Sequence, residues 1–265
     1  MCNHNENRNG LKVGFIGGCI SFPIGLENDK VYHALLKNAL SEIDIKMDKY
    51  YTYSELLDTS KEFIQRDSIE VVFLFARHFP YMVLNKPFIR FYGMNTKVKY
   101  SLHPWLMNYK MKVWPKYLDT YISEYRHQKI PKRKYFGLRD INSILGKILG
   151  LHNWAFRYIE KCIVELNELC ITNGVKLVVI GPTKNPETFM GDRICTYLNN
   201  RLVSAMSIKN IDFIDINSYT DKNEHSIFQP DNIHFNEFGH VFLCDKIKTI
   251  LQQIISSKLN LNHPA

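Results

Sequence analysis

The sequence contains no long apolar run and no apolar segment near its start. Without about 20 consecutive apolar residues, no part of the chain is expected to cross a membrane as a helix. The first nine residues are polar, Met-Cys-Asn-His-Asn-Glu-Asn-Arg-Asn, and lead directly into an apolar strand-like run. We therefore expect neither a secretory signal nor a lipoprotein signal. Both absences favour a cytoplasmic protein.

Closely spaced cysteine pairs are also absent. The six cysteines are scattered, with no C-x-x-C spacing: Cys2, Cys19, Cys162, Cys170, Cys195 and Cys244. The sequence thus predicts neither a zinc site nor a disulfide framework, and reduced thiols agree with a cytoplasmic location. A phosphate-binding fingerprint is missing too, because Gly17-Gly18 is followed neither by the third glycine of a dinucleotide site nor by the lysine of a P-loop. We expect no bound cofactor and no metal.

What the chain does contain is a regular alternation of apolar runs and amphipathic stretches. Its 265 residues are enough to bury a substantial core as one domain. We predict strands at 13–16, 43–47, 71–76, 176–180 and 212–214, and helices at 29–40, 54–65, 153–172, 191–206 and 237–257. Asn173-Gly174 is a typical helix-stop signal. This alternation predicts a three-layer α/β/α fold around a five-stranded parallel sheet.

One segment, residues 77–140, interrupts the alternation. It holds fourteen Lys or Arg against three acidic residues, a net charge of +11 in a chain whose total is +8. It also carries fourteen aromatic residues and repeated prolines, which argue against one long helix. Because it follows the third strand, we expect an inserted basic, aromatic cap beside the sheet edge that binds ligands. Such a cap suits an anionic partner, whereas no nucleic-acid motif accompanies it. The alternatives are a solvated basic surface and an oligomer interface.

Two short blocks near the ends of the chain carry candidate catalytic groups. The C-terminal block follows the last strand and spaces four residues as Asp231-x-x-His234-x-Asn236-x-x-Gly239. An Asp and a His so placed can serve as orienter and general base of a nucleophilic site. His240, the residue after Gly239, is expected on the helix surface.

The N-terminal block is a tight turn after the first strand. Gly17 and Gly18 permit backbone angles that other residues resist, so the following side chains can be presented at the carboxyl edge of the sheet. Cys19 and Ser21 are the candidate nucleophiles. A thiolate near a helix N-terminus and an imidazole has a lowered pKa, which favours Cys19.

Together these blocks resemble the SGNH (GDSL-like) hydrolase superfamily, whose fold is a flavodoxin-like α/β/α sandwich. The resemblance covers roughly residues 11–76 and 150–258. Gly17-Gly18-Cys19 stands where the family has Gly-Asp-Ser, so the resemblance implies Cys19 as a cysteine variant of the nucleophile. This variant is similar to some bacterial polysaccharide acyltransferase-like members. Asp231 and His234 match the family's Asp-x-x-His.

The other two family blocks differ in this sequence. The third strand runs into Arg77-His78 instead of Gly-x-Asn-Asp, so His78 stands near the oxyanion asparagine, with Arg77 beside it as a substrate contact. A histidine can donate the hydrogen bond that an oxyanion requires. The backbone at Gly18 and Cys19 would supply another donor. The glycine expected after the second strand is missing, since that region reads Lys49-Tyr-Tyr-Thr-Tyr-Ser54.

Several interpretations stay open at this point. Cys19 can be a small buried residue at a close-packed turn, Ser21 a helix cap or the true nucleophile, and His78 a core histidine. The leading hypothesis is an esterase or carbohydrate O-acyltransferase that forms a covalent acyl-enzyme on an anionic or glycan substrate, with acyl-CoA as a possible donor. The alternative is a catalytically silent domain that binds an anionic ligand or partner. The sequence does not indicate an oligomeric state.

Overall fold

The chain folds around a five-stranded parallel sheet with the strand order β2-β1-β3-β4-β5. The structure is a computed structural model that describes residues 10–17, 26–49, 53–76, 148, 150–182, 189–219, 227–228 and 235–262. The strands are β1 Leu11–Gly17, β2 Ile43–Lys49, β3 Val71–Phe75, β4 Lys176–Ile180 and β5 Asp212–Ile214. All five predicted strands are thus confirmed, as is the parallel sheet.

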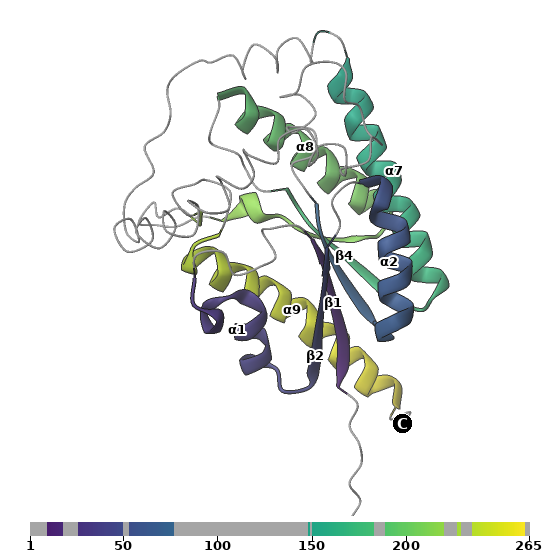
Figure 1. Cartoon of the computed structure of the whole chain (residues 1–265), viewed down its shortest axis with the longest axis vertical. Helices are drawn as coiled ribbons and strands as arrows, with labels where there is room; N and C mark the ends of the chain where they lie inside the picture. Colours follow the sequence, from purple (N-terminus) through teal and green to yellow (C-terminus); the bar gives the residue numbers. More distant parts are fainter. Residues whose placement is uncertain are drawn as a thin grey trace, which may run out of the picture.

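Helices cover both faces of this sheet (Figure 1). One layer holds α1 (Tyr32–Ala39) and α9 (Glu237–Asn262), and the other holds α2 (Tyr53–Asp67), α7 (Leu151–Thr172) and α8 (Phe189–Ile208). Two 3-10 turns, η2 (Asn28–Lys30) and η3 (Ile216–Ser218), complete the described elements. The α/β/α prediction is therefore confirmed. The inserted segment 77–140 lies outside the described residues, so the cap stays a prediction.

Strand side chains alternate between two hydrophobic cores, as the pleat requires. Val13 and Phe15 of β1 and Phe73 of β3 point into the core under α1 and α9. Ile16 and Leu74 point into the opposite core, under α2, α7 and α8. Because both faces of the central strands are buried, these strands read in the sequence as continuous apolar runs.

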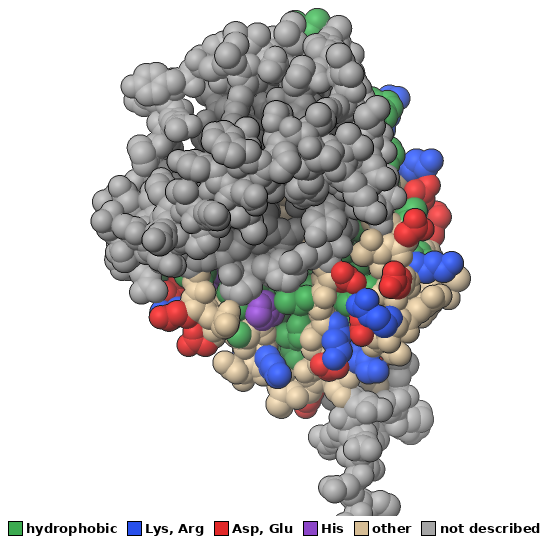
Figure 2. Space-filling model, viewed as in Figure 1, with side chains coloured by type: hydrophobic (Ala, Val, Ile, Leu, Met, Phe, Trp, Pro, Cys, Tyr) green, Lys and Arg blue, Asp and Glu red, His purple; other side chains and the backbone are tan. Residues whose placement is uncertain are grey.

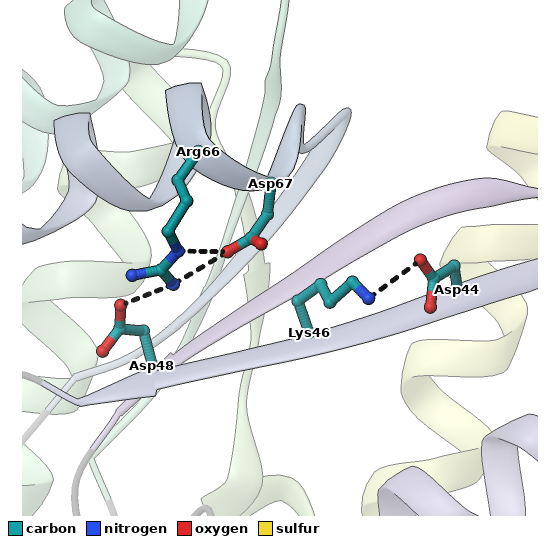
Figure 3. A network of polar contacts seen from close by, with 5 residues as sticks. All are labelled: Asp44, Lys46, Asp48, Arg66 and Asp67. Atoms are coloured by element: carbon teal, nitrogen blue, oxygen red, sulfur yellow. Dashed lines mark hydrogen bonds and ion pairs between the residues drawn. The ribbon is translucent and has the colours of Figure 1, made fainter.

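The edge strand β2 is protected by charge (Figure 3). Along it, Lys46 pairs with Asp44 at 3.2 Å, and Asp48 receives the guanidinium of Arg66 from α2 at 3.3 Å. Arg66 also holds Asp67 at 2.8 Å. Charged side chains on an edge strand discourage pairing with a second sheet, so this strand can end the sheet in water.

The predicted helix stop after Thr172 is confirmed and has a clear geometry. Gly174 adopts a left-handed conformation with φ +67°. Its N–H donates to the carbonyl of Ile171 at 3.0 Å, and the N–H of Val175 donates to Cys170 at 2.8 Å. This pair of bonds is the Schellman arrangement, in which glycine avoids the penalty that a Cβ would bring.

Among the described residues, no helix is long and apolar enough to span a bilayer. On the face seen in Figure 2, acidic and basic side chains of the described part are interspersed and do not gather by sign. The excess of Lys and Arg in the sequence belongs to residues 77–140, outside the described part.

Candidate active site

Strand order points to one position along the sheet edge where a ligand can bind. From β1 the chain first moves outward to β2, then returns to place β3 on the other side of β1. In open α/β sheets, ligands bind outside the carboxyl ends of the strands where the order reverses in this way. Here that point lies between the ends of β1 and β3, at Gly17 and Phe75. The predicted nucleophile turn and the predicted oxyanion residues follow these two strand ends.

None of the predicted site residues is itself described. Gly18, Cys19, Ser21, Arg77, His78, Asp231 and His234 all lie outside the described residues. What the structure provides are the residues that flank them: Gly17 before the turn, Ala76 after β3, and Phe235 directly after His234. The roles of the seven residues stay predictions, and the flanking residues are their anchors in the described fold.

A run of aromatic contacts connects these anchors within one core. Tyr32, the first residue of α1, packs against Phe15 of β1 with ring centroids 5.1 Å apart and against Phe75 of β3 at 5.7 Å. It also stacks on His240 of α9 at 5.9 Å, and His240 meets Phe235 edge-on at 5.8 Å. Phe235 is thus connected through the rings of His240 and Tyr32 to Phe15 of β1 and Phe75 of β3.

The loop that carries Asp231 and His234 has a closed base. Phe228 and Phe235 form an isolated antiparallel bridge, with their rings stacked at 5.6 Å. The N–H of Asn236 donates to the carbonyl of Ile227 at 3.0 Å, and its Nδ2 donates to the carbonyl of Phe228 at 3.1 Å. The described residues on either side of 229–234 therefore lie next to each other.

The same Asn236 caps the last helix. Its Oδ1 accepts a hydrogen bond from the N–H of Gly239 at 3.0 Å, which satisfies an otherwise orphaned donor in the first turn of α9. Gly239 in turn lies against the carbonyl oxygen of Ile227, where a Cβ would come within 2.3 Å of that oxygen. The Asn and Gly of the predicted pattern thus build the base of the loop, which the sequence pattern alone did not reveal.

The prediction for His240 is wrong. It was expected on the helix surface, but it is only 2% exposed. The reason is its position on α9, which turns the ring inward between Tyr32 and Phe235 instead of outward to solvent. Its neighbour Val241 occupies the exposed face, at 45%.

Sequence reasoning also missed a polar cluster at the ends of β4 and β5. Asp215, directly after β5, accepts at Oδ1 from Nδ2 of Asn199 at 2.9 Å and from the N–H of Asn217 at 2.8 Å. Asn217 also donates from Nδ2 to the carbonyl of Pro182 at 3.2 Å. The cluster fixes the segments that follow both strands. Asparagines scattered at 199 and 217 give no signal in sequence, because only folding brings them to Asp215.

The described cysteines are ordinary thiols. Cys162, Cys170 and Cys244 are buried and unpaired. Burial raises the pKa of Cys170 to about 12 and that of Cys244 to about 11, because the thiolate would lose its solvation. The pKa of Cys162 is also raised, chiefly by burial. None of these three has the activated thiolate that a nucleophile requires. In the described part of the chain, no group of three His, Cys, Asp or Glu side chains is arranged to hold a metal ion.

The sheet order, the two helix layers and the loop base together define a three-layer α/β/α sandwich of the flavodoxin-like type, with the loops at one carboxyl edge. Comparison with solved structures finds the same fold in a member of the lipolytic G-D-S-L family and in an acetyl xylan esterase.

Three solved structures illustrate the similarity. An acetyl xylan esterase, AlAXEase, is 14% identical over 91% of this chain and 99% of its own, with a TM-score of 0.53. A member of the lipolytic G-D-S-L family from Veillonella parvula is 11% identical over 89% and 96%, with a TM-score of 0.50. TesA is 12% identical over 91% and 98%, also with a TM-score of 0.50. At such identities the similarity establishes the fold, and activity has to be argued from the site.

Comparison with models of protein families finds no match. Comparison with curated protein sequences likewise finds none.

Proposed function

We propose that this protein is an SGNH-type acyl-transfer enzyme, an ester hydrolase or carbohydrate O-acyltransferase, that works through a covalent acyl-enzyme. The observation that carries the proposal is the closed base at residues 227–228 and 235–236 beneath the segment with Asp231 and His234. That base is connected by buried rings to the ends of β1 and β3, which precede Cys19 and His78. The solved structures with this fold are named as an esterase and lipolytic proteins, which agrees with ester chemistry.

The proposed reaction has two halves. In the first, His234 takes the proton of the Cys19 thiol while Asp231 orients the imidazole, and the sulfur attacks the acyl carbonyl. The bond to the leaving oxygen or sulfur breaks, and His234 returns the proton to that group. In the second half, water or a sugar hydroxyl attacks the thioester with His234 again as base, and Cys19 regains its proton. The N–H at Gly18 or Cys19 and the side chain of His78 would hold the oxyanion, with Arg77 beside them.

The substrate proposal rests on the basic, aromatic segment 77–140, which follows β3 in the chain. Its charge suits an anionic or glycan substrate, or a phosphorylated donor such as acyl-CoA. We also propose a cytoplasmic location, supported by the unpaired thiols of Cys162, Cys170 and Cys244. An acyl-CoA donor would be available there. The protein is proposed to act as a single domain without a bound cofactor.

The test is to trap the acyl group. Purified protein is incubated with acetyl-CoA and, separately, with an activated acetyl ester, and any adduct is mapped by peptide mass spectrometry. We expect acetyl on Cys19 in the wild type, none in Cys19→Ala, and a loss of turnover of about 10²–10⁴-fold in His234→Ala. Cys244→Ser is a matched control, because its thiol is buried and outside the site. An adduct found on Ser21, and lost in Ser21→Ala, would make Ser21 the nucleophile.

The second candidate is a silent SGNH-like domain that binds an anionic ligand. It is favoured by the sequence itself, which lacks the glycine after β2 and the asparagine after β3. Full turnover in both Cys19→Ala and His234→Ala would refute the roles proposed for these two residues. No adduct and no turnover with either donor in the wild type would count for the silent domain. The preferred donor in a positive result separates transferase from esterase.

A further inference from the structure

The N-terminus of α1 has no cap of its own. The residue at the cap position, Val31, offers no side-chain hydrogen bond, so the first N–H groups of the helix need acceptors from elsewhere. One acceptor comes from the opposite end of the sequence. The N–H of Tyr32 donates to Nδ1 of His240, 3.3 Å away and 208 residues later in the chain. Figure 1 shows α1 lying alongside α9, which carries His240.

In this bond Nδ1 is the acceptor, which requires that this nitrogen carries no proton. The ring is only 2% exposed and stacks on Tyr32 at an interplanar angle of 11°. A second histidine, His33, also contacts the Tyr32 ring, at 5.5 Å and nearly perpendicular, but it is only partly buried. His240 therefore differs from His33 in its backbone bond and in its full burial.

On its other side, His240 contacts the base of the C-terminal loop. Its ring lies edge-on to Phe235 at 5.8 Å, and its backbone N–H donates to the carbonyl of Asn236 at 3.0 Å. Phe235 directly follows His234, the proposed base. Tyr32 begins α1, thirteen residues after Cys19 in the chain. One buried imidazole thus contacts both α1 and the residue that follows the proposed base.

We propose that His240 is a positioning residue for the proposed reaction: its hydrogen bond to Tyr32 clamps the start of α1 to the part of α9 that follows Phe235, the residue next to His234. The inference rests on the proposed function, since it concerns the placement of His234. His240 acts through its hydrogen bond to Tyr32. A small error in this placement is costly, because a shift of about 1 Å in a reacting group can reduce the rate by about 10²-fold.

Two substitutions separate the clamp from simple packing. His240→Asn keeps an oxygen acceptor at the place of Nδ1, whereas His240→Phe keeps the ring and loses the acceptor. The same pair of substitutions at His33 serves as the control. We measure kcat and KM on an activated acetyl ester, with each variant shown to be folded by circular dichroism at the assay temperature. We also measure hydrogen exchange at the Tyr32 amide, which does not depend on activity.

We expect kcat to fall by about 10²-fold in His240→Phe, with KM within about threefold, and to return to within about threefold of wild type in His240→Asn. Exchange at the Tyr32 amide should be faster in the Phe variant alone, and both His33 variants should behave as wild type. Equal losses in the Phe and Asn variants, or full kcat in a folded Phe variant, would overturn the clamp. Should His240→Phe not fold, His240→Gln replaces it, because its amide reaches the Nε2 position and leaves Tyr32 without its acceptor.

Failure of the proposed function is distinguishable from failure of this inference. If wild-type protein forms no acyl adduct and hydrolyses no ester, the acyl-enzyme proposal fails. Hydrogen exchange at the Tyr32 amide then tests the clamp without any activity. Faster exchange in His240→Phe with wild-type exchange in His240→Asn supports the clamp, and equal exchange in the two variants refutes it.

Discussion

The carbonyl oxygen of Ile227 lies against Gly239 so closely that a Cβ at residue 239 would be 2.3 Å from it. The same carbonyl accepts the N–H of Asn236, so the contact is part of the base that closes the 229–234 loop. Glycine at this helical position therefore serves close packing of backbone on backbone, at some cost in helix propensity.

Gly239→Ala is expected to open that base. The new methyl group must displace the backbone at Ile227 or the ring of Phe235, which would lie 2.8 Å away, so we expect a loss of about 1–3 kcal/mol in the free energy of unfolding. Chemical denaturation measures this loss. Val241→Ala, at an exposed position on the same helix, is the control and should stay within about 0.5 kcal/mol of wild type. Equal stability of Gly239→Ala and wild type would show that the contact is not as tight as described.

Asn236 has two functions that substitution can separate. Asn236→Asp keeps an oxygen to accept from Gly239 but replaces the Nδ2 donor to Phe228 with a second oxygen. Asn236→Ala loses both, and loss of the cap alone costs about 1 kcal/mol. We expect Asn236→Asp to preserve most of the stability of α9 while ester turnover falls. The reason is that the carbonyl of Phe228 would then face a carboxylate oxygen instead of an N–H donor. Thermal unfolding and turnover are measured on both variants, and wild-type turnover in the Asp variant would argue against a role of the base in positioning His234.

Thiol labelling should separate Cys19 from the buried cysteines. Burial raises the pKa of Cys170 to about 12 and of Cys244 to about 11, so at pH 7 very little of either is thiolate and both should alkylate slowly in the folded protein. If Cys19 is an activated nucleophile, it should react faster than these two by orders of magnitude. Quantitative mass spectrometry after iodoacetamide treatment measures the rates. Unfolded protein is the control, in which the three rates should converge, and a Cys19 as slow as Cys170 would favour the silent domain.

Glu70 predicts a dependence of stability on pH. Burial by itself would raise the pKa of this carboxyl, but its bonds with Lys258 and with the N–H of Lys12 outweigh burial, and the pKa lies below its ordinary value of 4.5. A lowered pKa stabilises the fold above the unfolded value, and this stabilisation is lost as pH falls through the folded value.

Glu70→Gln should therefore lose stability at neutral pH and match the wild type in acid. Because the side chain of Glu70 is 40% exposed, we expect the loss at pH 7 to be only about 0.5 kcal/mol. Urea titrations of both proteins between about pH 3 and 7 give the comparison. Glu165→Gln, in an exposed pair with Lys161, is the control. A gap between Glu70→Gln and wild type that widens on acidification would contradict the assignment.

Asn199 and Asp215 should be energetically coupled. The amide of Asn199, 2% exposed, donates to Asp215, while its Oδ1 has no hydrogen-bond partner among the described residues. Removing Asp215 leaves the buried amide of Asn199 without this acceptor, whereas Asp215 without Asn199 still accepts from the N–H of Asn217. We therefore expect Asp215→Ala to cost about 1–3 kcal/mol, Asn199→Ala less, and the pair less than the sum. A double-mutant cycle by denaturation measures this coupling. Strict additivity would mean that the hydrogen bond contributes nothing to the stability of the β4 and β5 ends.

The sequence determined the framework because the periodicity of its apolar residues is local. Runs such as Val71–Phe75 are continuous, as expected for strands buried on both faces, and all five predicted strands and the C-terminal end of α7 are found where the pattern puts them. The pattern Asp231-x-x-His234-x-Asn236-x-x-Gly239 likewise predicted a segment with catalytic residues before the last helix. It did not reveal that Asn236 and Gly239 build the base of the loop, since their partners Ile227 and Phe228 are defined only by three-dimensional contact.

Only the tertiary structure decided the place of His240 and of the Asn199–Asp215 pair. A histidine near the start of an amphipathic helix can face either way, and its orientation depends on what packs against the helix. Here the backbone N–H of Tyr32, 208 residues away in sequence, donates to Nδ1 of His240 and holds the ring inside. Long-range partners of this kind leave no periodic signal in the chain. The sequence therefore determined the elements and the chemistry expected of them, and folding decided which side chains meet.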